Sequence, residues 1–262
     1  MNPRRQALLQ ALRQRRAVKV IAGIANFDRL HVQRVTQAAT IARATAVDVA
    51  ARPDIVSAVR AMTDLPVFVS CIRPDALIEA AAHGADVLEI GNYDALYEEG
   101  LFLTPEEVLN IARKTLAGVD SQDVMTCVTI PGHLSLDTQL SLAERLAAMG
   151  VDMLQTEGAA RVVSAQPTMK ALSAEEKFEI TLNNARILAS HVSTPVMAAS
   201  GIDLDNVRRA LESGAAAVGV GRAVSALPTM DAMVERIERM MLEVGRCAHA
   251  PFLSPYAASA RA

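Results

Sequence analysis

The sequence predicts a single (β/α)8 (TIM) barrel, an α/β fold, with one extra helix at its N-terminus. Eight short aliphatic runs alternate with longer amphipathic stretches along a chain of 262 residues, and a barrel of this kind takes about 250 residues. The runs are AVKVIAG (17–23), TAVDVAA (45–51), PVFVSCI (66–72), DVLEIGN (86–92), VMTCVTI (124–130), DMLQTEG (152–158), PVMAASG (195–201) and AAVGVGR (216–222).

A weak internal repeat favours the closed barrel over a doubly wound open sheet, which would show the same local alternation. Segments 84–91, 150–158 and 214–221 each place a glycine after a helix and then enter a strand. Aligned with the second run, they bring four residues of the even strands to one level: Asp48, Glu89, Gln155 and Gly219. Because side chains from alternate strands form layers inside a barrel, the repeat predicts one polar interior layer.

The chain divides into three predicted parts. We expect residues 1–16 to form a helix that caps the bottom of the barrel, residues 17–244 to form the barrel, and residues 245–262 to form a flexible tail. The connections at 93–103 and 159–172 are long and follow strand ends. Barrels carry their sites at this face, so we expect both connections to lie near a site.

Two helices begin at explicit capping signals. Thr104 precedes Pro105 and lies three residues before Glu107, and Ser173 lies three residues before Glu176. Both patterns predict a capping box, in which the hydroxyl and the glutamate satisfy free backbone N–H groups of the first turn.

Composition restricts the class of protein. The chain is 51% hydrophobic but 3% aromatic and has no Trp, which is typical of aliphatic parallel strands buried on both faces. A net charge of −3 gives no support for a nucleic-acid partner, and no apolar stretch reaches the ~18 residues of a membrane span. Three cysteines lack metal-ligand spacing and no secretory signal is present. We therefore expect a cytoplasmic protein with no metal, membrane or nucleic-acid partner. The sequence leaves open whether the protein forms a homo-oligomer.

Glycine-bearing turns follow the last two strands. Ser200 and Gly201 end the seventh run, whereas Gly219, Gly221 and Arg222 end the eighth. Loops at these two positions often bind phosphate in (β/α)8 barrels, because glycine lets backbone N–H groups approach an anion. We predict that all five residues bind phosphate. The alternative is that the glycines only make tight turns.

A lysine and three acidic residues form the predicted catalytic group. Lys19 lies inside the first strand, and alignment with the third and seventh runs indicates that it faces inward. A buried lysine needs a partner, and Asp48, Glu89 and Glu157 are the candidates. Lys19 either forms a Schiff base, its pKa lowered by burial, or steadies an enolate while a carboxylate moves protons. An ion-pair network that only fills the barrel is the structural alternative.

Further polar residues lie at strand ends and are predicted to bind substrate. They are Asn26, Asn92, Gln155 and His133. His133 follows a Pro-Gly pair after the fifth strand, which makes it the histidine on the face where we expect the site.

Four motifs resemble those of a known family: KVIAGIANFD, LEIGNYDALYEEG, QTEG and ASGI. They are similar to the conserved hypothetical plastid reading-frame family of cyanobacteria and red-algal plastids, a TIM-barrel domain of unknown function, over residues 17–244. The resemblance implies a barrel of the aldolase or ribulose-phosphate-binding type, located in the cyanobacterial cytosol or the plastid stroma, and no established reaction. It also implies family motif positions for Lys19, Asn26, Asp28, Glu89, Asn92, Asp94, Gln155, Glu157, Ser200 and Gly201.

These observations predict an enzyme that acts on a small phosphorylated carbonyl metabolite as a lyase, aldolase or isomerase. Two alternatives remain open. The chain could bind or sense a phosphorylated metabolite without catalysis, or it could be an oxidoreductase whose FMN phosphate occupies the glycine turns. No other cofactor is implied.

Overall fold

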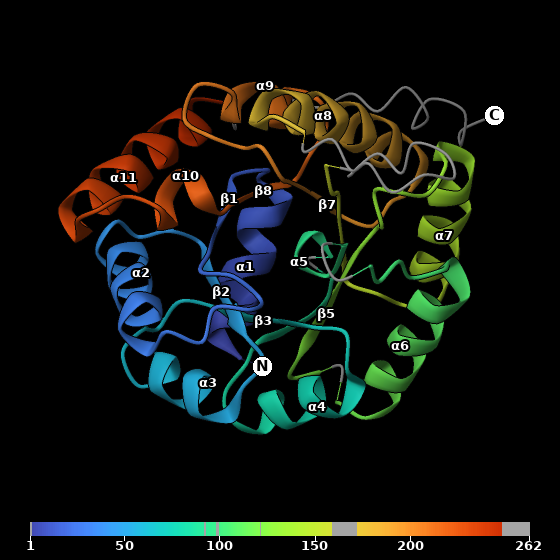
Figure 1. Cartoon of the computed structure of the whole chain (residues 1–262), viewed down its shortest axis with the longest axis horizontal. Coiled ribbons are helices and arrows are strands. Elements are labelled where there is room, and N and C mark those ends of the chain that lie inside the picture. The colour runs from blue at the N-terminus through green and yellow to red at the C-terminus, as the bar shows by residue number, and fades with distance from the viewer. Residues whose placement is uncertain (1, 92, 98–99, 121, 159–171, 248–262) are drawn as a thin grey trace.

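Eight parallel strands form a closed barrel in chain order in the computed structural model (Figure 1). The structure describes residues 2–91, 93–97, 100–120, 122–158 and 172–247. The strands are β1 (Ala17–Ile21), β2 (Ala46–Ala50), β3 (Val67–Cys71), β4 (Val87–Ile90), β5 (Met125–Thr129), β6 (Met153–Gln155), β7 (Val196–Ala199) and β8 (Ala217–Val220). Each lies within one of the eight aliphatic runs, so the predicted fold class is confirmed.

Helices surround the barrel and connect its strands (Figure 1). They are α1 (Pro3–Arg13), α2 (Arg29–Ile41), α3 (Pro53–Arg60), α4 (Pro74–Ala82), α5 (Asp94–Tyr97), α6 (Pro105–Ala117), α7 (Leu136–Ala148), α8 (Ala174–His191), α9 (Val207–Glu212), α10 (Arg222–Ser225) and α11 (Met230–Cys247). Both predicted capping boxes are present. Thr104 and Glu107 cap α6, and Ser173 and Glu176 cap α8.

The last helix extends beyond its predicted end. Helix α11 continues through Cys247, so residues 245–247, which we assigned to a flexible tail, are helical. The apolar stripe of α11, which includes the buried Ile237 and Val244, continues to Cys247, which packs partly buried against the core, and this explains why the helix does not stop at 244. Residues 248–262 lie outside the described residues, as do residues 159–171 of the second long connection.

The period-two alternation of the strands separates two cores. Outward valines such as Val18, Val47 and Val218 pack under the helices in one large cluster. Inward residues form a second cluster at the bottom of the barrel, and it includes Phe68 and Met197. Because both faces of each strand are covered, apolar residues dominate both sides.

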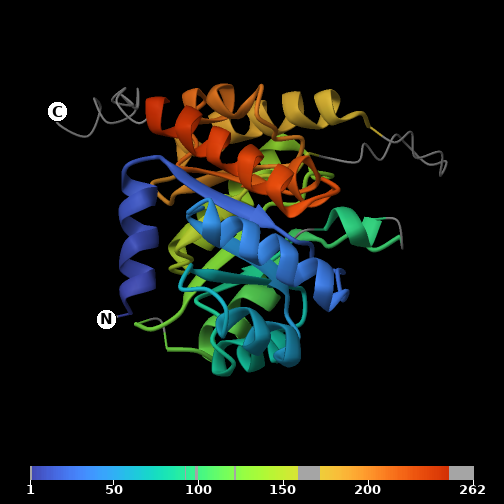
Figure 2. The same ribbon diagram turned by 90° about the vertical axis from the view of Figure 1, so that its left-hand side faces the viewer.

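Helix α1 closes the bottom of the barrel. Its Leu8 and Leu12 are buried within the interior cluster. Figure 2 shows α1 at one end of the barrel and α5 at the opposite end. The C-terminal ends of the strands therefore point away from α1, toward the face that carries the candidate site.

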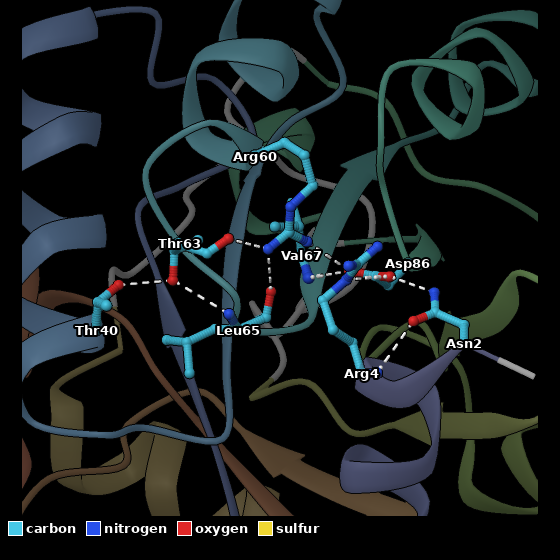
Figure 3. Close-up of polar contacts among 8 residues, drawn as sticks. All are labelled: Asn2, Arg4, Thr40, Arg60, Thr63, Leu65, Val67 and Asp86. Carbon is cyan, nitrogen blue, oxygen red and sulfur yellow. Dashed lines mark hydrogen bonds and ion pairs between the residues drawn. The ribbon is translucent and has the colours of Figure 1, made fainter.

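A buried carboxylate fixes α1 in place (Figure 3). Asp86, which is 2% exposed, accepts hydrogen bonds from Arg4 Nε at 2.9 Å, Asn2 Nδ2 at 2.8 Å and Arg60 Nη1 at 2.9 Å. The backbone N–H of Val67 donates to the same carboxylate at 3.0 Å. One side chain thus joins α1, the end of α3 and the start of β3.

Candidate functional site

The centre of the barrel holds a buried polar layer. Lys19 donates to Glu89 and to Gln155 Oε1, the latter at 2.7 Å, and Gln155 Nε2 donates to Glu89 Oε1 at 2.7 Å. All three side chains are at most 1% exposed. Glu89 and Gln155 come from β4 and β6, as the repeat in the sequence predicts, and Lys19 comes from β1, as its alignment with the third and seventh runs predicts.

Asp48 and Gly219 also face the interior. The Ser70 hydroxyl donates to Asp48 Oδ1 at 2.7 Å, and Asp48 is fully buried. A Cβ added to Gly219 would lie 3.2 Å from Ile21 Cδ1 and 3.4 Å from Met197 Sδ. The four residues that the repeat aligns therefore all contribute to the inner surface of the barrel.

Lys19 is held in its charged form. Burial by itself lowers the pKa of Lys19, but the negative charges of Glu89 and Asp48 raise it, so the pKa lies above its ordinary value. The Phe68 ring adds a cation–π contact, its centroid 5.0 Å from Nζ. A Schiff-base lysine needs the opposite shift, because only the neutral amine attacks a carbonyl. Of the two roles predicted for Lys19, the Schiff base therefore does not fit the raised pKa, whereas stabilisation of an enolate by the charged ammonium is compatible with it.

A cavity of about 720 Å³ opens above this layer, at the C-terminal ends of β5 to β8. Its floor includes Thr129, Gln155 and Gly219, and Glu157 lies on its wall. The volume is within the range of small-molecule sites. Lys19, Glu89 and Asp48 do not line it, so the predicted catalytic lysine lies beneath the cavity floor, with Gln155 between it and the cavity.

The glycine turns form one side of the same cavity. Ser200, Gly201, Gly219, Gly221 and Arg222 all line it. Ser200 and Gly201 have positive φ angles of 86° and 72°, which turn the chain sharply at the end of β7. All five predicted phosphate-binding residues thus line one cavity.

Two further cations line the cavity. They are Lys177 on α8 and Arg236 on α11, and both are half-buried. Sequence reasoning missed them because each lies on an amphipathic helix, where a lysine or arginine is indistinguishable from one on a solvated face. The position of Lys177 in the first turns of α8, directly after the capping box, is the one feature that could have indicated it.

Glu157 is held by residues from two other loops. Its Oε2 accepts a hydrogen bond from the Tyr97 hydroxyl at 2.6 Å and from the Gly132 N–H at 3.2 Å. Glu157 is 4% exposed and Tyr97 is 2% exposed. Donors to a carboxylate favour its ionised form. The two hydrogen bonds hold the Glu157 carboxylate in a fixed position at the end of β6.

The remaining predicted substrate ligands lie elsewhere. His133 does not line the cavity; its Nδ1 lies 3.2 Å from the Tyr97 hydroxyl oxygen. Asn26 does not line it either, since its Nδ2 donates to the Ala22 carbonyl at 3.0 Å and its Oδ1 accepts from the Asp28 N–H. Both side chains hold loops in place. Asn92 lies outside the described residues.

Among the described residues, no group of three or more His, Cys, Asp or Glu side chains is arranged to hold a metal ion. Within the same part of the chain, no helix is long and apolar enough to cross a bilayer.

A family model described as protein of unknown function (DUF561) matches residues 2–249. The chain belongs to this family. An uncharacterized protein ycf23 of Antithamnion sp. is 34% identical over 253 residues, covering 94% of this chain and 91% of that protein. The ycf23 protein of Cyanophora paradoxa is 32% identical over 234 residues, covering 89% and 94%. The resemblance inferred from the motifs is thereby confirmed.

Solved structures similar to this member of the DUF561 family are barrels of the aldolase and ribulose-phosphate-binding type. Thiamine phosphate pyrophosphorylase from Pyrococcus furiosus is 19% identical, with a TM-score of 0.57, covering 90% of this chain and 98% of that chain. KGPDC from Streptococcus mutans in complex with D-R5P is 12% identical, with a TM-score of 0.60, covering 88% and 97%. At these identities the likeness establishes the fold alone.

Proposed function

We propose that this protein is an enzyme, a lyase, aldolase or isomerase, that acts on a small phosphorylated carbonyl compound in the cyanobacterial cytosol or the plastid stroma. The observation that carries the proposal is that one cavity joins a held carboxylate, Glu157, to the turns after β7 and β8. A phosphorylated substrate needs an anion site and a proton-transfer group within the length of one small molecule.

The phosphate end of the cavity combines backbone and positive charge. Gly201 and Gly221 expose backbone without a side chain in the way, and anions bind to such turns. Lys177, Arg222 and Arg236 supply cations from three different helices. Asp203 also lines this region. The cations and the exposed backbone of the turns together suit an anionic group such as phosphate.

The carbonyl end of the cavity combines a base with a nearby positive charge. Glu157, whose ionised form is favoured by the Tyr97 and Gly132 donors, would take a proton from the carbon next to the carbonyl group. The negative charge would then move to the carbonyl oxygen. Thr129 and Gln155 lie at the floor where that oxygen would sit, and the Lys19 ammonium lies directly beneath Gln155. A fixed cation in a low-dielectric interior stabilises such charge strongly.

Ligand binding is tested first, by thermal shift with inorganic phosphate, small phosphorylated aldehydes and ketones, and FMN. A ligand at about 100 times its Kd stabilises by roughly 2.7 kcal/mol, which raises the Tm by about 5–10 °C at this size. Arg236→Ala should weaken binding at least tenfold. Arg239→Ala is the matched control, since Arg239 lies on the same helix, is exposed and does not line the cavity.

Each outcome discriminates between the functions. No stabilisation by any phosphorylated compound contradicts the proposal, and stabilisation by FMN alone supports the oxidoreductase alternative. With a ligand in hand, Glu157→Gln should retain binding and abolish turnover. A wild-type protein that binds its ligand and makes no product supports the non-catalytic binder or sensor.

A further inference from the structure

We propose that Tyr97 is a positioning residue that orients the Glu157 carboxylate and keeps it ionised, and that His133 holds Tyr97 in the donating orientation. The inference rests on the proposed function, in which Glu157 accepts a proton. It assigns a role to Tyr97, and it replaces the predicted contact of His133 with substrate by a contact with Tyr97.

Tyr97 is fixed on three sides. Its ring stacks on Phe102 with centroids 5.1 Å apart and planes 12° apart, and it meets the His133 ring edge to face at 5.5 Å. Phe102 and His133 also contact each other, at 5.4 Å. The hydroxyl points out of this cluster toward Glu157 Oε2, 2.6 Å away. A rigid donor at this distance fixes one oxygen of the carboxylate.

Tyr97 has one hydroxyl proton, so the direction of the hydrogen bonds that link His133, Tyr97 and Glu157 depends on which neighbour receives that proton. If Tyr97 donates to Glu157, the Tyr97 oxygen accepts from His133, so the Nδ1 nitrogen of His133 must carry a proton. If His133 instead places its proton on Nε2, Nδ1 becomes an acceptor and competes with Glu157 for the Tyr97 proton. The 2.6 Å distance to Glu157 is shorter than the 3.2 Å distance to His133. The shorter bond is the charge-assisted one, which favours donation to Glu157.

His133 is neutral in this arrangement. Partial burial lowers the pKa of His133, and the backbone of Leu103 only partly offsets that effect. A neutral imidazole has one ring proton to place. The Leu103 carbonyl also accepts from the His133 ring, so it competes with the Tyr97 oxygen for that proton. With the proton on Nδ1, as the proposal requires, hydrogen bonds run from His133 Nδ1–H to Tyr97 and from Tyr97 to Glu157, and both support a negative charge on Glu157.

The first test measures the titration of the Glu157 carboxyl by NMR in full-length protein labelled with 13C-glutamate, with Glu157→Gln used to assign the resonance. Tyr97→Phe keeps the ring stack but removes the donor, so the pKa of Glu157 should rise by about one unit. Tyr93→Phe is the control: Tyr93 is equally buried, immediately precedes α5, and donates to the Ile90 carbonyl at 3.4 Å. It should leave the titration of Glu157 within a few tenths of a unit.

The histidine variants test the second contact. His133→Asn retains a side-chain donor near the Nδ1 position, whereas His133→Leu retains none, so the leucine variant alone should raise the pKa of Glu157. The 15N shifts of the His133 ring in wild-type protein should show the Nδ1–H tautomer, which packing by itself does not select. The proposal is overturned by an unchanged Glu157 titration in a folded Tyr97→Phe variant, by an equal change in Tyr93→Phe, or by the Nε2–H tautomer.

These measurements use protein without ligand, so they stand apart from the ligand screen that tests the proposed function. If a substrate is found, Tyr97→Phe should lower kcat about tenfold or more and change KM little, because it acts on the base and not on the phosphate end. A wild-type kcat in that variant would contradict the role of Tyr97 even if the carboxyl titration had shifted.

Discussion

Lys19 carries a positive charge at the buried centre of the barrel, between the polar layer and the interior cluster that contains Phe68. A charge in such a place is tolerated only when it is paired and hydrogen-bonded. Glu89 and Gln155 provide both, and the acidic partners raise the pKa of Lys19. The stability that the charged Lys19 contributes is therefore fully present below the lysine pKa of the unfolded chain and is lost as the pH rises through the raised pKa of the folded protein.

Removing the lysine alone should be costly. Lys19→Met leaves the fully buried Glu89 without its cation, and breaking a buried pair in this way costs about 3–5 kcal/mol. The double variant Lys19→Met with Glu89→Gln leaves no unpaired charge and should recover about half of the loss. Urea denaturation of both variants checks this expectation. Equal stabilities for the single and double variants would contradict it.

At the scale of elements, the turn after β7 couples the candidate phosphate site to the packing of α8. Gly201 has a φ of 72°, and a Cβ there would lie 2.6 Å from both the Ala174 carbonyl oxygen and the Phe178 nitrogen. These are backbone atoms of α8, so a side chain could be accommodated only by moving the helix. The same turn contributes Ser200 and Gly201 to the cavity.

Two alanine substitutions separate backbone strain from close packing: Gly201→Ala at this turn and Gly100→Ala in the connection between α5 and α6. Gly100→Ala introduces a Cβ at a φ of 78° into open space and should cost about 1–2 kcal/mol of strain. Gly201→Ala adds the clash with α8 and should cost roughly 2–5 kcal/mol. Thermal unfolding measures both, and ligand binding should weaken only in Gly201→Ala. A similar loss of stability in the two variants would mean that α8 does not pack as closely as the structure shows.

The helix that covers the bottom of the barrel depends on a second element-scale contact. Asp86 and Asp152 occupy the same place in the internal repeat, and each accepts from the backbone N–H of the neighbouring strand. Asp86 is 2% exposed and pairs with two arginines, whereas the side chain of Asp152 is 22% exposed and pairs with Arg5 at 3.5 Å. Asp86 and Asp152 can therefore be compared as a buried and a more exposed carboxylate at equivalent positions of the repeat.

Neutralising these two aspartates should give unequal effects. Asp86→Asn removes a charge that holds Arg4 and Arg60 and should cost about 2–4 kcal/mol. Asp152→Asn should cost about 1 kcal/mol or less. Hydrogen exchange in α1 should accelerate more in the first variant, because Asp86 holds both Arg4 and the N-cap residue Asn2, whereas Asp152 contacts that helix only through Arg5 at 3.5 Å. Unchanged exchange in α1 would show that Leu8 and Leu12 are sufficient to hold it.

At the scale of the whole molecule, sequence patterns predicted the barrel because every strand is buried on both faces and leaves a continuous aliphatic run. They also predicted the polar layer, since the repeat fixes the register of Glu89, Gln155 and Gly219. Which side chains of a strand face the barrel interior follows from the alternation along that strand. It could therefore be predicted from a few adjacent residues.

The parts of the candidate site that depend on loops and distant helices were not predictable in this way. Tyr97 reaches Glu157 through the connection after β4, whose path is set by its stacking on Phe102 and His133. Lys177 meets the cavity only because α8 packs against the turn at Gly201. The Schiff-base alternative for Lys19 assumed that desolvation outweighs the charges of its acidic partners, and the raised pKa of Lys19 indicates the reverse.

The cluster around Tyr97 joins the loops after β4, β5 and β6, and its histidine makes the stability of the whole molecule depend on pH. Burial lowers the pKa of His133 below its ordinary value of 6.5, so between the two values the unfolded chain binds more protons than the folded one. Stability therefore rises with pH in that window. The stability that the neutral His133 ring contributes is fully present above its pKa in the unfolded chain. It is lost as the pH falls through its lower pKa in the folded protein. Because the ring is half-exposed, we expect a loss of less than about 1 kcal/mol.

Urea unfolding between pH 8 and pH 5 should reveal this dependence as a difference between wild type and His133→Asn. The variant lacks the titrating ring but keeps a donor for Tyr97, so carboxylates titrating in the same range affect both proteins alike. Its stability should fall less steeply below about pH 6.5. Parallel curves would mean that His133 has the same pKa in the folded and unfolded chains, and the loops after β4 and β5 would then be more open to water than their ring contacts imply.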